Sequence, residues 1–142
     1  MLFSELHPRG VLGVVLLTFL ASNAHAGYGD GVSAVEKAQL PLFCYRQLGV
    51  AGATGPQYGI PEGCGAGMNH YCPGLVRLIR AKKEPDRRKA LSLLGSVEAD
   101  VRYTLDWMKP YPNCPIRGHV EATQAEIKRL KLLWGGGGGG KR

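Results

Sequence analysis

Residues 69–76 read NHYCPGLV, and residues 111–120 read YPNCPIRGHV. In both stretches a cysteine and a proline stand immediately before an apolar pattern with a helical period. Proline is favoured in the first turn of a helix, because its missing N–H would have no partner there in any case. The two stretches therefore predict two helices that begin alike, each with a cysteine at its amino end.

The apolar pattern between residues 68 and 134 predicts three helices joined by short turns. The first begins at Pro73 and ends near Lys83. The second covers about 86–109, and the third begins at Pro115. The third has the clearest period, carried by Ile116, Val120, Thr123, Ile127, Leu130 and Trp134. Short turns make successive helices antiparallel neighbours, so the first and third helices are expected to run parallel to each other.

The region before these helices has a less regular pattern. Residues 34–48 predict a helix that Pro41 disturbs, and Ser33 stands three residues before Glu36, the spacing of a capping box. Residues 49–67 contain seven glycines and two prolines without a regular period, so a long loop is expected there. A loop of that length in a small domain usually has to be anchored to the rest of the fold.

The first 26 residues have the pattern of a secretory signal peptide. Arg9 provides the positive charge of the polar start, and an apolar run of ten residues follows at 11–20. That run is shorter than the roughly 20 residues that a membrane-spanning helix needs. Residues 24–26, AHA, form a small–x–small cleavage pattern, so residues 1–26 are predicted to be removed, with a buried core helix as the alternative.

The other end of the sequence has six glycines after Trp134, followed by Lys141 and Arg142. We expect residues 135–142 to form a flexible tail, because glycine loses the most conformational entropy on ordering. The remaining residues, 27–134, are expected to form a single helical domain. No second apolar run reaches transmembrane length, so no transmembrane segment is expected after signal cleavage.

The formal net charge of the chain is +7, and an excess of positive charge in an exported protein favours anionic partners. Membrane headgroups, acidic polysaccharide and acidic protein surfaces are such partners, whereas nucleic acid is not expected there. The densest run of positive charge is Arg77, Arg80, Lys82, Lys83, Arg87, Arg88 and Lys89. A helix dipole favours cations at the carboxyl end and disfavours them at the amino end, where Arg87 to Lys89 stand. We therefore predict an anionic-partner patch here, with a solvated turn as the alternative.

The four cysteines, Cys44, Cys64, Cys72 and Cys114, all follow the predicted cleavage site. An even number of cysteines in a small exported domain predicts two disulfides, and four cysteines permit three pairings. In a stack of helical hairpins, equivalent helices lie side by side with their amino ends together. We therefore expect Cys72 to pair with Cys114, and Cys44 with Cys64, which would anchor the glycine-rich loop.

The helix–turn–helix rhythm repeats at a spacing of about 42 residues, in NHYCPGLVRLIRAKK, ALSLLGSVEADVRYTLDWM and CPIRGHVEATQAEIKRL. It resembles a tetratricopeptide-like helical repeat over residues 68–134. That family usually has about 34 residues per unit. Its small-residue pattern is matched here only at Ala90, Ala99 and Tyr103. The resemblance implies a protein-binding scaffold, and a plain disulfide-linked helical bundle is equally consistent with the pattern.

A set of possible metal ligands lies at Cys64, Met68, His70 and Cys72. Copper(I) favours sulfur ligands and zinc accepts cysteine and histidine, but the spacing contains no C-x-x-C pair, and oxidised cysteines would supply no thiolate.

Four aromatic residues, Tyr103, Trp107, Tyr111 and Trp134, are candidates either for an aromatic groove or for core packing.

The sequence therefore predicts an all-α protein of three to four helices with two disulfides, exported to the periplasm or secreted. It contains no nucleotide-binding loop and no catalytic constellation, so neither an enzyme nor a cofactor is expected. The leading hypothesis is a non-catalytic scaffold that binds a protein or an anionic envelope component. One alternative is a periplasmic metal-binding or redox protein, and another is an accessory subunit of an envelope complex.

Overall fold

The computed structural model describes residues 31–135, and within that range the chain is all-α. Its four α-helices are α1 (Ala34–Lys37), α2 (Tyr71–Lys83), α3 (Arg87–Met108) and α4 (Arg117–Gly135). Three 3-10 helices precede α2, namely η1 (Leu42–Cys44), η2 (Pro56–Tyr58) and η3 (Ala66–His70). The predicted fold class is confirmed. The predicted signal peptide, and the predicted tail beyond Gly135, lie outside the described residues.

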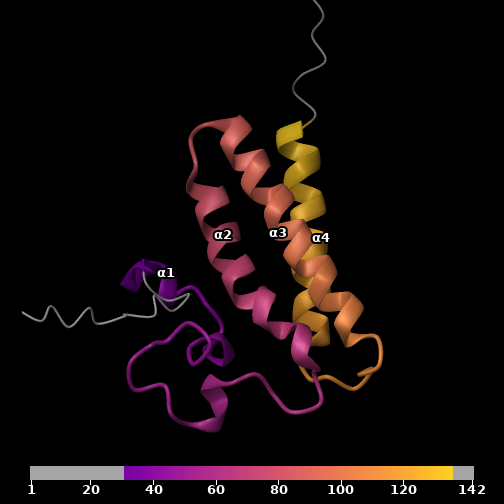
Figure 1. The fold of residues 1–142 in the computed structure, drawn as a ribbon. Helices are drawn as coiled ribbons and strands as arrows, with labels where there is room; N and C mark the ends of the chain where they lie inside the picture. The colour runs from indigo at the N-terminus through magenta and orange to yellow at the C-terminus, as the bar shows by residue number, and fades with distance from the viewer. Residues whose placement is uncertain (1–30, 136–142) are drawn as a thin grey trace, which may run out of the picture.

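Helices α2, α3 and α4 lie side by side, and successive helices run in opposite directions (Figure 1). Helix α3 packs against both α2 and α4. Residues 84–86 join α2 to α3, and residues 109–116 join α3 to α4. The carboxyl ends of α2 and α4 therefore lie at the same end of the molecule as the amino end of α3.

Helix α4 buries most of the face that its period predicts, and α3 also buries one face. On α4 the buried side chains are those of Val120, Thr123, Ile127 and Leu130. On α3 they are those of Ala90, Leu94, Val97, Val101, Thr104 and Met108. Helix α2 is buried over most of its circumference, because the segment before it, residues 31–70, covers the side that α3 and α4 leave open.

The helix predicted over 34–48 is wrong in length. Only Ala34–Lys37 is α-helical, with the predicted capping box formed by Ser33 and Glu36. A helical Pro41 would have no N–H for the carbonyl of Lys37, and its ring would clash with that carbonyl. The hydroxyl of Tyr45 donates to the Lys37 carbonyl instead, at 3.1 Å. Pro41 therefore ends α1 and leads into η1.

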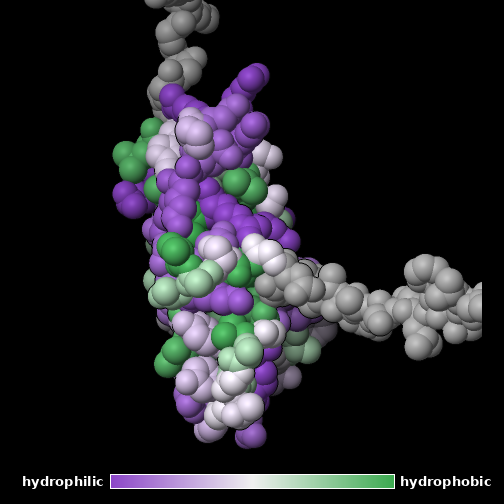
Figure 2. Space-filling model, turned by 90° about the vertical axis from the view of Figure 1, so that its left-hand side faces the viewer, coloured by the Kyte–Doolittle hydropathy of each residue, from purple (hydrophilic) through white to green (hydrophobic). Residues whose placement is uncertain are grey.

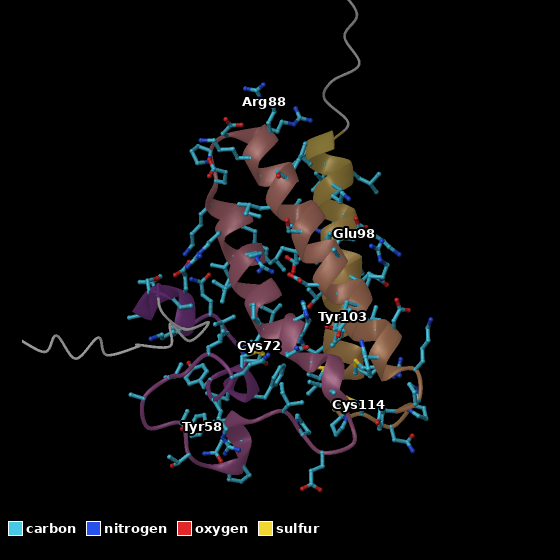
Figure 3. All side chains as sticks on the ribbon, in the orientation of Figure 1. Tyr58, Cys72, Arg88, Glu98, Tyr103 and Cys114 are labelled. Carbon is cyan, nitrogen blue, oxygen red and sulfur yellow. A yellow bond between two sulfur atoms is a disulfide. The ribbon has the colours of Figure 1, made fainter. Side chains whose placement is uncertain are left out.

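The predicted disulfide pairing is also wrong, although all four cysteines are bridged. Cys44 pairs with Cys72, and Cys64 pairs with Cys114, with Cα–Cα distances of 5.4 and 4.7 Å. Both helix-start cysteines do lie at one end of the molecule (Figure 3). The ring of Tyr71 bridges α2 to α4 at this point, since its hydroxyl contacts Thr123 at 2.7 Å. Each helix-start cysteine is therefore joined to the segment 31–70 rather than to the other helix.

Candidate functional site

Three of the seven predicted patch residues are paired with carboxylates of other elements. Arg77 contacts Asp100 on α3. Lys82 Nζ lies 2.7 Å from Glu126 Oε1 on α4, and Arg80 Nε lies 2.6 Å from Glu36 Oε1 on α1. These three cations therefore hold α2 against its neighbours, and the structure does not gather all seven into one binding surface.

In the pair between Arg80 and Glu36, each partner shifts the pKa of the other. The hydrogen bond from Arg80, followed by those from Ser33, lowers the pKa of the nearly buried Glu36 from 4.5 to about 2. Hydrogen bonding to Glu36 in turn raises the pKa of Arg80. A second donor nitrogen of Arg80 lies 2.7 Å from the Gly31 carbonyl oxygen. This pair therefore closes the start of the segment 31–70 onto α2.

The other four predicted patch residues are Lys83, Arg87, Arg88 and Lys89, which we call the basic end. All four side chains are exposed, and none forms an ion pair within residues 31–135. Arg88 lies at the tip of the molecule and points away from it (Figure 3). Hydrophilic side chains gather over this end, with a few hydrophobic ones beside them (Figure 2).

The two carboxylates of the same turn are occupied by backbone hydrogen bonds. Asp86 caps α3, since its Oδ1 accepts from the backbone N–H groups of Arg88 and Lys89 at 2.9 and 3.2 Å. Glu84 Oε1 accepts from the backbone N–H of Asp86 at 3.0 Å. The turn is therefore built by its acidic residues, and its cations are left facing solvent.

Three of the four aromatic candidates form a row at the opposite end of α3. Tyr103, Trp107 and Tyr111 are each partly exposed, and the Tyr103 and Trp107 ring centroids lie 6.1 Å apart. The His70 ring extends the row, with its centroid 4.4 Å from that of Tyr103. We call His70, Tyr103, Trp107 and Tyr111 the aromatic row.

A glycine pair makes room for the aromatic row. A Cβ at Gly67 would lie 2.2 Å from Trp107 Cβ, and a Cβ at Gly65 would lie 2.7 Å from the Tyr111 ring. Gly65 also has a φ of +78°, which side chains with a Cβ rarely adopt. Trp134 is not part of this row, because it lines a shallow cavity with Pro85 and Arg87 at the basic end.

A hydrogen-bonded cluster that the sequence analysis missed lies between α2 and α4. The Tyr71 hydroxyl is 2.5 Å from His119 Nδ1 and 2.7 Å from Thr123 Oγ1. Burial raises the pKa of Tyr71 to about 12, so this hydroxyl keeps its proton. Tyr71 is fully buried whereas His119 is exposed, and the cluster joins α2 to α4. No motif spacing marks a pair so far apart in the chain.

The alternative metal site loses its sulfur anions in this structure. Cys64 and Cys72 are bridged to two different partners, so neither supplies a thiolate. Met68 is buried, and His70 contacts Asp100 Oδ1 at 3.3 Å. Across residues 31–135 no group of three or more histidine, cysteine or acidic side chains is arranged to hold a metal ion.

The comparisons with known proteins add no relative. No protein family matches the chain, and neither the curated proteins nor the solved structures contain a match. None of the helices between residues 31 and 135 has both the length and the apolar character that crossing a bilayer requires.

Proposed function

We propose that this chain is an exported, non-catalytic interaction protein that holds an anionic partner at its basic end. The observation that carries the proposal is the set of four exposed cations, Lys83, Arg87, Arg88 and Lys89, without ion-pair partners among the described residues. Two disulfides support the exported part of the proposal, because disulfides persist in oxidising compartments.

The placement of these cations favours binding over folding as their role. Arg87, Arg88 and Lys89 occupy the first turn of α3, where the helix dipole opposes positive charge. Helix formation does not explain three cations there, since the first turn of a helix favours acidic residues. An anionic partner would relieve this repulsion, so its binding would be stronger at low ionic strength.

A second surface supports a protein partner. The aromatic row exposes Trp107 and two tyrosines, residue types that are enriched at the centres of protein interfaces. Together with the antiparallel pair of α2 and α3, the aromatic row supports the scaffold hypothesis, in which the chain is a tetratricopeptide-like unit. It also supports the alternative of an accessory subunit of an envelope complex. Substitution of Trp107 by Ala would then weaken retention of a protein partner without changing retention by a polyanion.

The proposal is tested by chromatography on a column that carries the polyanion heparin. We expect the double variant Arg87→Gln and Arg88→Gln to elute at a clearly lower salt concentration than the wild type. The control is Arg102→Gln with Lys109→Gln, which removes the same charge from two exposed positions. Arg102 lies on α3, and Lys109, which directly follows α3, forms an ion pair with Asp106. Equal elution shifts for the two variants would mean that net charge, and not the basic end, holds the anion.

A further inference from the structure

The last turn of α4 exposes two consecutive leucines. Leu132 and Leu133 are 77% and 62% exposed, and Leu132 is the most exposed large hydrophobic residue within residues 31–135. Single exposed leucines are ordinary in soluble proteins. Two adjacent ones on an amphipathic helix that already buries its own apolar face need a reason outside the fold.

These leucines lie at the same end of the molecule as the basic end. Trp134, the next residue, lines a shallow cavity with Pro85 and Arg87 of the α2–α3 turn. Two further cations, Lys128 and Arg129, are exposed on the turn before the leucines, without an ion pair among the described residues. Apolar side chains, a tryptophan and a surplus of cations are therefore gathered on one end.

We infer that this end docks on the surface of an anionic phospholipid bilayer. The cations of the basic end would contact headgroup phosphates, while Leu132 and Leu133 would enter the boundary between headgroups and acyl chains. Protein surfaces that lie between the headgroups and the acyl chains typically expose apolar residues surrounded by Lys and Arg, with Trp at the edge. The inference rests on the proposed function, because it names the anionic partner of the same basic end.

The geometry of the two leucines favours a bilayer over an acidic protein. Consecutive residues of an α-helix point about 100° apart, so Leu132 and Leu133 leave the last turn in two different directions. A rigid partner would need a separate pocket for each side chain. A fluid bilayer approached by the end of the helix accommodates both, and the surrounding cations remain at headgroup level.

The expected size of the effect follows from the chemistry of each group. Each Lys or Arg near an anionic membrane strengthens partition by about fivefold. Neutralising Arg87 and Arg88 should therefore weaken binding about 30-fold. Shortening both leucines to alanine removes apolar area that the bilayer would otherwise cover, and should weaken binding by about tenfold.

The experiment measures sedimentation of the chain with vesicles of phosphatidylglycerol and phosphatidylcholine, against vesicles of phosphatidylcholine alone. We expect binding to the anionic vesicles only, with both double variants weakened as above. Arg102→Gln with Lys109→Gln is the charge control. Val35→Ala with Leu42→Ala is the apolar control, since both residues are exposed and lie in the segment 31–70. The charge control should lose only the small effect of its changed net charge, and the apolar control should bind as the wild type does.

A second measurement reports the depth of docking. In a Trp107→Phe background only Trp134 fluoresces, and lipids with brominated acyl chains should quench it when anionic vesicles are added. Absence of quenching, or wild-type vesicle binding by Leu132→Ala with Leu133→Ala, would overturn the bilayer inference. If the leucine variant loses vesicle binding but keeps heparin binding, the inference stands. If replacing Arg87 and Arg88 changes neither heparin binding nor vesicle binding, the proposed function is contradicted as well.

Discussion

The two ends of the helical unit are built from different interactions. At one end both disulfides and the hydroxyl of Tyr71 join α2, α4 and the segment 31–70. At the other end the four exposed cations of the basic end have no ion-pair partner among the described residues. We call the first of these the stapled end. The covalent crosslinks therefore lie at the stapled end, and the basic end carries cations that the fold does not pair.

The segment 31–70 shows why the stapled end needs its crosslinks. Apart from α1 and three 3-10 helices it has no regular structure, and side chains bond to several of its backbone carbonyls. Arg46 donates to the carbonyls of Thr54 and Gly55 at 3.0 and 2.8 Å, and Gln47 donates to that of Met68 at 3.1 Å. Such bonds contribute about 1 kcal/mol each, too little to order a long irregular segment without a covalent constraint.

The largest expected effect is therefore removal of a disulfide. Replacing Cys64 and Cys114 with alanine should lower the free energy of unfolding by about 4 kcal/mol, because this bridge closes a loop of 50 residues. Replacing Cys44 and Cys72, which close a loop of 28, should cost about 3.5 kcal/mol. Urea unfolding followed by circular dichroism measures both. A loss below about 1 kcal/mol in either variant would show that the segment 31–70 is ordered without its staples.

The sequence predicts the helices of the three-helix part well, because α3 and α4 each bury one face and their apolar periods record that face. It fails where the packing of distant segments decides the outcome. The pairing of Cys72 with Cys44 depends on where the segment 31–70 lies, and no local pattern encodes that position. Helix α2 begins at Tyr71 rather than Pro73 because η3 leads directly into it.

The candidate site shows the same division. The basic run is visible in the sequence, but the carboxylates that pair with three of its seven cations are not. Glu36, Asp100 and Glu126 belong to three other helices, and only the fold brings them to Arg80, Arg77 and Lys82. The four cations that remain lie close to the turn, where no carboxylate of the described residues pairs with them.

The second prediction concerns Gly67, below the aromatic row. An alanine Cβ would lie 2.2 Å from Trp107 Cβ, so the backbone of η3 or of α3 has to shift. Gly67→Ala should therefore destabilise the fold by about 1–3 kcal/mol, as overpacked sites do. Thermal unfolding measures the loss. The matched control is Gly95→Ala on α3, where an added Cβ has open space and should stabilise the helix slightly. Equal behaviour of the two variants would contradict the close contact.

The third prediction concerns pH and the pair between Glu36 and Arg80. The folded pKa of Glu36 is about 2, below its ordinary value of 4.5, so the folded state favours the ionised form. The resulting stability is fully present above about pH 4.5 and is lost as the pH falls towards about 2. Glu36→Gln should cost about 1 kcal/mol near neutral pH, because Arg80 is half-exposed and water screens the pair. The difference between wild type and variant should shrink to nothing by about pH 2, and a difference that persists there would assign the effect to packing instead.

The smallest expected effect is at the basic end itself. Arg87→Gln with Arg88→Gln should change the free energy of unfolding by no more than about 0.5 kcal/mol, and in the stabilising direction, because two cations leave the positive end of the α3 dipole. Urea unfolding at low and high salt measures this, and the gain should fade as salt screens the charges. A clear loss of stability would mean that these arginines hold α3 in place, as Arg77, Arg80 and Lys82 hold α2. The two ends would then differ in degree only. The proposed function requires that this variant is at least as stable as the wild type and that a polyanion retains it less strongly.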